Sequence, residues 1–196
     1  MFKNAVLALV AASSLVAGSA GAEGLRPFIG GGITVGGDNV NTLRYQGGDE
    51  ATLHAGGLLD LRAGVDYRVW ESPMSVQASI AYHTDRSNAN NGSADFSRVP
   101  VELVLQWHAT ESWAFGGGLR KATGARYNAS GAASSQTVDQ KFKSSVGFII
   151  EGEYFFNPSF GLKARYVNEE YTSESNPSAA KLDGSHVGVL AVYYFR

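Results

Sequence analysis

Residues 184–196 read Gly184-Ser-His-Val-Gly-Val-Leu-Ala-Val-Tyr-Tyr-Phe-Arg196. Every second position from Val187 to Phe195 carries an apolar or aromatic side chain. In a β-strand such positions all lie on the same face. The stretch is therefore predicted to form a strand with one continuous apolar face that ends in aromatic residues.

The N-terminal region has the features of an export signal. Lys3 precedes a short apolar run, and small residues follow up to Ala20-Gly21-Ala22. A positive start, an apolar run and an A-x-A site are typical of a secretory signal peptide. The run is too short for a transmembrane helix, which needs about 20 apolar residues. We expect residues 1–22 to be the signal peptide and residues 23–196 to form one domain.

The composition narrows the possible functions. The formal net charge is −2, so the chain lacks the basic character that nucleic-acid binding requires. The sequence has no cysteine, which excludes a disulfide framework and a thiolate metal site. Since no second apolar segment has spanning length, integration into a membrane would need strands closed into a barrel.

Strand-like segments and connections alternate along the mature chain. Eight segments carry the strand pattern, near 25–35, 54–69, 75–84, 97–108, 113–122, 142–155, 159–168 and 185–195. Three connections are short, at 70–74, 109–112 and 156–159. Four are long and rich in Gly, Ser, Asn and Asp, at 36–53, 85–96, 123–141 and 169–184. Short periplasmic turns and long outer loops are typical of antiparallel outer-membrane barrels.

The polarity of alternate positions indicates which solvent surrounds the barrel. In the fourth segment Val99, Val101, Leu103, Leu105 and Trp107 alternate with residues such as Glu102 and Gln106. A soluble barrel of the lipocalin type has an apolar interior and a wet exterior. Charged side chains inside and apolar side chains outside fit a lipid environment instead.

Aromatic residues are expected to form two interfacial girdles. The girdle near the short turns would contain Trp70, Trp107, Trp113, Phe156, Phe160, Tyr193 and Phe195. The girdle near the long loops would contain Tyr82, Phe96, Phe142 and Tyr166.

These features together resemble the small eight-stranded outer-membrane β-barrels, the class of the OmpA transmembrane domain. The last strand resembles that family's assembly signal, although Arg196 follows the aromatic residue on which the family usually ends. The resemblance implies an all-β, eight-stranded antiparallel transmembrane barrel in the outer membrane of a Gram-negative bacterium. It also implies outer-membrane lipids, lipopolysaccharide and the barrel-assembly machinery as partners, and it identifies no surface ligand.

An eight-stranded barrel has an interior just wide enough to be filled by side chains. The inward positions carry charges of both signs, which must be paired to persist in a buried site. We expect a polar, salt-bridged lumen in which Glu151 and Glu153 pair with Lys163 and Arg165. The remaining predicted members of this network are Arg62, Asp66, Arg68, Glu102 and Arg120. Such a plug argues against a conducting pore, and a narrow channel stays open as an alternative.

Histidines mark the other candidate site. His54, His83 and His186 are expected near the outer rim, in contact with water. Their spacing matches no metal motif, so no metal and no cofactor are predicted.

An enzyme is the main alternative to a structural or surface-interaction role of the outer loops. Asp85 follows His83 by two residues, and Ser185 directly precedes His186. Acyl transfer on lipid A or phospholipid would need such a hydroxyl or acid beside an imidazole. The His-x-Ser motif of lipid A deacylases is absent. The sequence therefore favours a non-enzymatic protein that presents its long loops at the cell surface.

Overall fold

The computed structural model describes residues 24–44, 50–69, 71–89, 92–131 and 139–195. The predicted signal peptide and Trp70 lie outside the described residues. None of the described segments is a helix long and apolar enough to cross a membrane.

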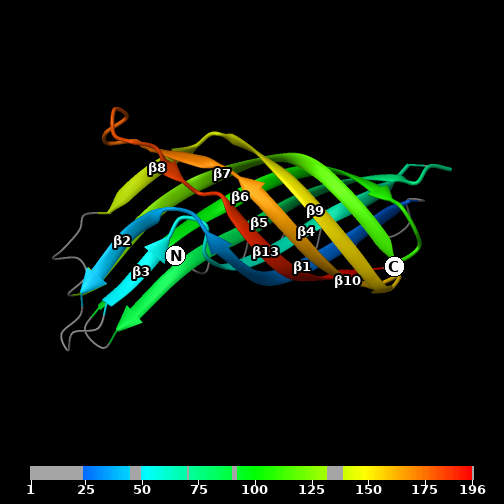
Figure 1. Cartoon of the computed structure of the whole chain (residues 1–196), viewed down its shortest axis with the longest axis horizontal. Helices are drawn as coiled ribbons and strands as arrows, with labels where there is room; N and C mark the ends of the chain where they lie inside the picture. The colour runs from blue at the N-terminus through cyan, green and yellow to red at the C-terminus, as the bar shows by residue number, and fades with distance from the viewer. Residues whose placement is uncertain (1–23, 45–49, 70, 90–91, 132–138, 196) are drawn as a thin grey trace.

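Antiparallel strands close into a barrel, in agreement with the prediction (Figure 1). Each strand pairs with the next along the chain, and β1 pairs with β13 to close the ring. The eight strands are β1 (Leu25–Gly36), β4 (Leu58–Arg68), β5 (Met74–Ala89), β6 (Gly92–His108), β7 (Trp113–Gly131), β9 (Val146–Asn157), β10 (Phe160–Asn168) and β13 (His186–Tyr194).

Shorter strands extend one end of the barrel, which we call the outer end. The opposite end, where the short connections 109–112 and 158–159 lie, is called the inner end. The outer-end strands are β2 (Asn39–Arg44), β3 (Glu50–His54), β8 (Gln140–Ser144), β11 (Glu170–Ser173) and β12 (Leu182–Asp183). β8, β11 and β12 continue the wall beside β7, and β2 pairs with β3 as a hairpin. In Figure 1 β2, β3 and β8 lie opposite the C-terminus.

Two of the expected loops are largely strand. Residues 85–89 of β5 and 92–96 of β6 are paired, and the two strands stay in register up to Ala89 and Gly92. β7 likewise continues through much of 123–141 and pairs with β6 and β8 there. Neighbouring strands satisfy the backbone on both sides of β7, so its polar and small residues do not end it. The predicted loop boundaries were wrong for this reason.

A β-bulge in β7 changes which residues face inward. Ser97 pairs with Arg126 but Val99 pairs with Thr123, so β7 has one residue more than β6. Gly124 lies in this extra length with a φ of +60°, a conformation that glycine adopts at little cost. Even positions face the interior below the bulge, and odd positions such as Tyr127 face it above.

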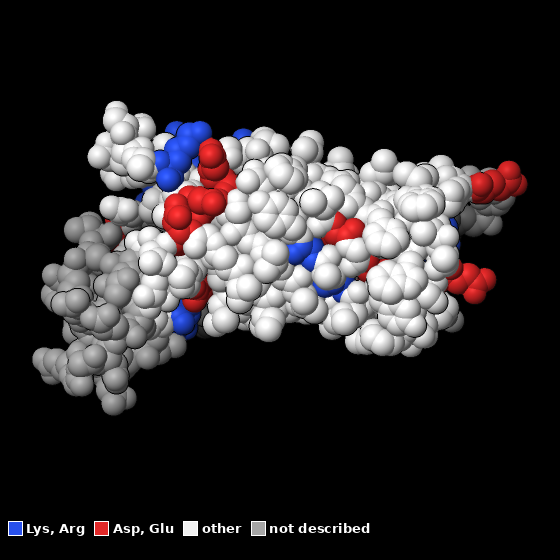
Figure 2. All heavy atoms as spheres, in the orientation of Figure 1, with Lys and Arg blue, Asp and Glu red and all other residues white. Residues whose placement is uncertain are grey.

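The two faces of the barrel wall have opposite polarity between the ends. Outward Leu119 and Val146 are 58% and 61% exposed, whereas inward Glu102 is 2% exposed. Figure 2 shows a largely uncharged wall, with charged atoms near the ends and one small group in the middle. An apolar exterior of this extent is stable in a bilayer and not in water. The chain therefore forms a transmembrane barrel.

Aromatic side chains surround the inner end as predicted, but the outer girdle is incomplete. Trp113 and Phe115 stack at the inner end, and Tyr154 packs edge-on against Trp113. At the outer end Tyr166 faces outward, whereas Phe96 is fully buried inside and Phe142 packs against it. Phe96 and Phe142 were thus wrongly predicted to face lipid, because this part of the wall has an apolar inner face.

Candidate functional site

The centre of the barrel interior is organised around the carboxylate of Glu102 on β6. Its Oε2 accepts from Arg62 Nη1 on β4 at 2.8 Å and from Arg165 Nη2 on β10 at 2.8 Å. Its Oε1 accepts from Arg120 Nη1 on β7 at 2.7 Å. Because β10 lies across the barrel from β6 in the strand order, these ion pairs cross the lumen. All four side chains are buried.

A second group of polar contacts lies toward the inner end. Lys163 Nζ donates to Glu151 Oε1 at 2.6 Å and to Gln77 Oε1 on β5 at 2.9 Å. The Tyr194 hydroxyl donates to Glu153 Oε1 at 2.8 Å, and Lys163 Nζ lies 3.4 Å from Glu153 Oε2. These contacts again join opposite walls, because β5 and β10 are not neighbours.

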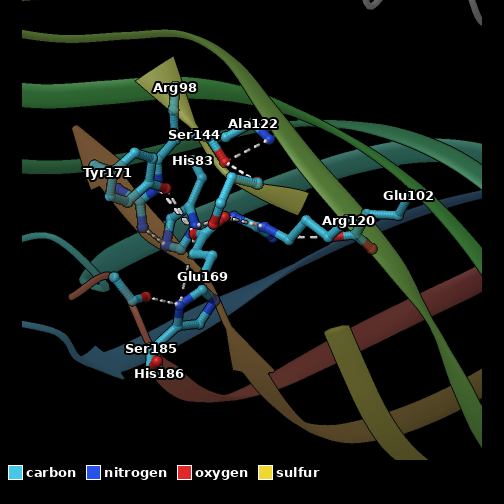
Figure 3. A network of polar contacts seen from close by, with 12 residues as sticks. His83, Arg98, Glu102, Arg120, Ala122, Ser144, Glu169, Tyr171, Ser185 and His186 are labelled. Atoms are coloured by element: carbon cyan, nitrogen blue, oxygen red, sulfur yellow. Dashed lines mark hydrogen bonds and ion pairs between the residues drawn. The ribbon is translucent and has the colours of Figure 1, made fainter. Parts of the chain in front are cut away.

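A third group lies toward the outer end and is centred on Glu169 (Figure 3). Arg120 Nε donates to Glu169 Oε2 at 2.9 Å, and the Tyr171 hydroxyl donates to Oε1 at 2.6 Å. Arg98 Nε lies 3.7 Å from the same carboxylate. Arg120 therefore connects this group to Glu102, which makes one continuous network along the lumen.

The His83 ring lies inside this network between two guanidinium groups. Arg120 Nη2 lies 3.1 Å from its Nδ1, and Arg98 Nη2 lies 3.1 Å from its Nε2. A guanidinium can only donate, and a neutral imidazole has one acceptor nitrogen, so at most one of these two contacts is a hydrogen bond in the neutral ring. Thr34 Oγ1 lies 2.7 Å from Nε2, and its hydroxyl can either donate or accept there. His186 packs edge-on against the His83 ring, with centroids 4.9 Å apart.

The prediction of water-exposed rim histidines was wrong for two of the three residues. His83 and His186 are 0% and 2% exposed. β5 continues past His83 to Ala89, β13 begins at His186, and outer-end strands cover the mouth of the barrel above both rings. The strand of His83 was predicted to end at residue 84, five residues before its observed end, and this had set its ring at the rim. His186 does lie at the outer end of its strand, and the outer-end strands bury it there.

The residues considered for catalysis do not form a hydroxyl–imidazole–carboxylate relay among the described residues. Ser185 Oγ accepts from Asn168 Nδ2 at 3.1 Å. Asp85 Oδ2 accepts from the backbone N–H of His54 at 2.8 Å. Only the two rings of His83 and His186 come together, inside the wall and away from lipid.

An apolar cluster closes the outer mouth above the charged network. Its buried members are Leu53, Ala55, Ala94, Phe96, Ala122, Ala125, Tyr127 and Tyr171. We call it the outer cap. Phe96 contacts Tyr171 edge-on at 5.4 Å, and the Arg98 guanidinium lies over the Phe96 ring at 5.2 Å. Leu53 comes from the β2–β3 hairpin, which thus folds over the barrel.

The inner mouth is open by comparison. A depression of about 410 Å³ is lined there by residues that include Arg26, Arg68 and His108. Arg26 pairs with Asp66 at 2.6 Å. Arg68, expected in the lumen network, is instead exposed at this mouth and forms no ion pair with a described residue.

Known proteins match this chain in structure but not in sequence. No family model and no curated protein matches it. The crystal structure of Ail, the attachment invasion locus protein of Yersinia pestis, matches with a TM-score of 0.53 at 16% identity, covering 87% of this chain and 96% of that chain. Neisserial surface protein A matches with a TM-score of 0.51 at 11% identity, covering 89% and 97%.

The chain has the fold of these small barrels. A further structure of Ail, in complex with the heparin analogue sucrose octasulfate, matches with a TM-score of 0.51 at 14% identity, covering 87% of this chain and 97% of that chain. At such identities the likeness concerns the fold alone. The predicted resemblance to small outer-membrane barrels is confirmed at that level.

Two central residues of the network were not named from the sequence. Arg98 lies at an even position of its strand, like Glu102, so the alternation did contain a signal for it. Glu169 was assigned to a loop, and only the continuation of the wall from β10 into β11 turns it inward. Arg98 and Glu169 show that side-chain alternation is informative only where the strand boundaries are known.

Proposed function

We propose that this protein is a closed barrel in the outer membrane of a Gram-negative bacterium that acts through its outer end in surface interaction. The observation that carries the proposal is the closure of the lumen. Ion pairs of Glu102 join β4, β6, β7 and β10 across the interior, and the outer cap lies above them. A path for solutes would require breaking several buried, charge-assisted contacts.

The outer end supplies the surface that such a role needs. β5, β6 and β7 continue beyond the apolar wall, and β2, β3, β8, β11 and β12 add to them. Rigid strands with polar exteriors present side chains in fixed positions, which suits recognition better than free loops do. The names of the similar barrels, an attachment invasion locus protein and a surface protein, agree with this use of the fold.

Single-channel recording in planar bilayers tests the closed lumen. We expect the wild-type protein to show no steady conductance, and Glu102→Ala, which removes the carboxylate that three arginines share, to show flickering openings. Steady conductance by the wild-type protein would support the channel alternative and overturn this proposal.

Lipid chemistry separates the proposal from the enzyme alternative. Mass spectrometry of lipid A and phospholipids from cells lacking and overproducing the protein should give identical acyl patterns. An acyl chain gained or lost in step with the protein would identify an enzyme. His83→Ala and His186→Ala would then show whether these two histidines take part.

Surface interaction is tested by removing the outer end while keeping the barrel. Replacing 86–95 by a two-residue turn shortens the β5–β6 hairpin without touching the apolar wall. In bacterial aggregation and host-cell attachment assays we expect the shortened protein to lose the wild-type effect. Equal attachment by both proteins, at equal surface levels, would contradict the role of the outer end.

A further inference from the structure

The depression at the inner mouth has the size and construction of a small-ligand site. Its rim comes from the three short connections, with Ser72 and Pro73 between β4 and β5, Thr110 and Glu111 between β6 and β7, and Pro158 between β9 and β10. The ends of β1, β4, β6 and β9 complete its wall. Its volume of about 410 Å³ lies within the range of about 300–1,000 Å³ that is usual for small-ligand pockets. We call this depression the inner pocket.

The floor of the inner pocket is apolar. Phe155 is buried, whereas the other lining residues are at least partly exposed, so Phe155 lies deepest. Its ring stacks on His108 with centroids 6.0 Å apart and packs against Tyr194 at 5.7 Å. Pro73 and Pro158 add exposed apolar rings at the rim. Such a pocket accepts an apolar or aromatic group of a ligand.

One side of the inner pocket, formed by β1 and β4, carries two guanidinium groups. Arg26 donates from Nε and Nη2 to Asp66 Oδ2, at 3.1 and 2.6 Å, and lies over the Tyr194 ring at 4.9 Å. Arg68 lies two residues beyond Asp66 on the same face of β4, about 7 Å along the strand. It is exposed and forms no ion pair within the part of the chain that the structure describes. Because Asp66 already pairs with Arg26, the planar fork of Arg68 is available to an anion.

Hydroxyl groups on two of the connections add donors at the rim. Ser72 Oγ accepts from the Met74 backbone N–H at 3.1 Å. Thr110 Oγ1 accepts from the backbone N–H groups of Ser112 and Trp113, at 3.2 and 3.0 Å. Because each oxygen accepts in these contacts, its hydrogen can donate to a ligand. A carboxylate, which only accepts, fits a rim of such donors.

The acid at the rim restricts the charge of the ligand. Glu111 is exposed and lies in the β6–β7 connection, and β5 separates β6 from β4 in the sheet. A ligand held by Arg68 therefore reaches toward Glu111 with its other end, where a second negative charge would be repelled. The inner pocket suits a ligand with one carboxylate and an apolar remainder, and not a dianion such as phosphate.

We propose that the inner pocket binds a small apolar monocarboxylate, with its carboxylate on Arg68 and its apolar group against Phe155. A free carboxylic acid and the C-terminus of a polypeptide share this chemistry. The inference goes beyond the proposed surface role and does not depend on it, because the inner pocket lies at the opposite end of the barrel. In an outer-membrane barrel with short turns at this end, the pocket faces the periplasm.

Isothermal titration calorimetry of the barrel folded in an uncharged detergent tests the carboxylate half of the site, with N-acetyl-L-phenylalanine as the probe and detergent alone as the blank. We expect Arg68→Gln to bind it about tenfold more weakly, because hydrogen bonds to a charged group are the stronger kind. Arg68→Lys keeps the charge without the fork and should lose less. Lys143→Gln removes an exposed cation from β8 at the outer end and should change affinity less than twofold. Equal binding by Arg68→Gln and the wild type would overturn the proposal.

Changing the probe separates the carboxylate from the apolar group. N-acetyl-L-phenylalaninamide lacks the charge, acetate lacks the ring, and both should bind the wild type at least about tenfold more weakly than N-acetyl-L-phenylalanine. If the amide binds as well as the acid, the pocket is only an apolar depression and the proposal fails.

Glu111→Gln gives an effect of the opposite sign. Removing the rim acid should tighten binding of N-acetyl-L-phenylalanine about twofold, which is the size of an exposed charge interaction. Phosphate should compete poorly with the wild type and better with this variant. If phosphate displaces the acid from the wild type at equal concentration, the pocket is a general anion surface and the carboxylate assignment is overturned.

A peptide probe distinguishes the two sources of the carboxylate. The peptide Gly-Gly-Gly-Ala-Phe is compared in its free-acid and amidated forms. Binding of its free-acid form as tight as that of N-acetyl-L-phenylalanine would support a polypeptide chain end as the ligand. Binding of N-acetyl-L-phenylalanine alone would support a free small acid. The proposal is overturned if neither acid binds.

Failure of this inference and failure of the proposed function give different results. Each variant is first checked for folding by its heat-modifiable gel mobility. Arg68→Gln should keep wild-type attachment to host cells, and the protein with the shortened β5–β6 hairpin should bind N-acetyl-L-phenylalanine as the wild type does. Loss of attachment in Arg68→Gln would show that the two ends do not act separately and would overturn the independence stated above.

Discussion

The membrane-spanning part of the barrel and its outer end are built with opposite polarity. In the spanning part Glu102 faces inward and Leu103 faces outward. In the outer end, on the same strand β6, apolar Phe96 faces inward and the outward neighbours are polar. One strand thus changes its inner face from charged to apolar within a few residues, because its outer face passes from lipid into water.

The network and the outer cap meet at Arg98. Its guanidinium lies over the Phe96 ring at 5.2 Å, and its Nε lies 3.7 Å from the Glu169 carboxylate. The lumen therefore has no sharp boundary between a charged plug and an apolar core. This comparison teaches that solvent, rather than strand propensity, determines which face of each segment is charged.

Removing the central acid should have the largest effect on this arrangement. Glu102→Ala leaves three buried guanidinium groups without their shared carboxylate. We expect it to lower the free energy of unfolding by about 3–5 kcal/mol, measured by urea titration in lipid vesicles. Glu102→Gln keeps an acceptor and should lose less, and Glu111→Ala, at the inner mouth, should lose almost nothing. A stability loss below about 1 kcal/mol for Glu102→Ala would show that the network is not structural.

The same charged side chain should be tolerated on the outer face of one region and not of the other. Leu103 is 55% exposed on the lipid-facing wall, and Ser130 is exposed near the outer tip of β7. Leu103→Arg should cost about 2–4 kcal/mol in the same vesicle titration, because a charge near the bilayer centre is poorly solvated. Ser130→Arg should change stability by less than about 0.5 kcal/mol. Similar costs at the two positions would contradict the assigned membrane boundaries.

The bulge that separates the two regions gives the smallest of these effects. Gly124 has a φ of +60°, and a Cβ atom at this position would meet no other atom within 4 Å, so Gly124→Ala changes conformational strain and not packing. We expect a loss of about 1 kcal/mol, measured in the same vesicle titration. Gly117→Ala, on the same strand with ordinary φ, would meet only the Ile149 carbonyl oxygen, at 3.9 Å, and should be neutral or slightly stabilising. Unchanged stability for Gly124→Ala would show that the bulge can relax without cost.

The spanning part could be predicted from alternation alone. Glu102 between Val101 and Leu103, or Lys163 between Leu162 and Ala164, requires only a period of two and a choice of solvent. The residues also indicated lipid as the solvent outside the barrel. If the charged faces pointed outward to water, all the apolar faces would have to fit inside a small barrel, so the apolar faces must point outward into lipid. The pairing of Lys163 with Glu151 could be anticipated from neighbouring strands, whereas the contact of Arg165 with Glu102 across the lumen could not.

The outer end could not be predicted in the same way. Phe96 and Glu169 lie in segments whose small and polar residues are typical of loops, and the bulge at Gly124 shifts the alternation by one residue. Nothing local distinguishes these segments from free loops. Their pairing depends on partners such as Tyr127 and Tyr171, which are distant in the sequence or belong to other strands.

The sequence by itself determined the strand number, the polarity of each face in the spanning part and the lipid environment, because these depend on short-range alternation and on the cost of exposing charge to lipid. Only the tertiary structure decided how far the strands continue, which charges meet across the lumen and how the outer mouth is closed. These features depend on contacts between residues on non-adjacent strands, whose register is set by closure of the whole barrel.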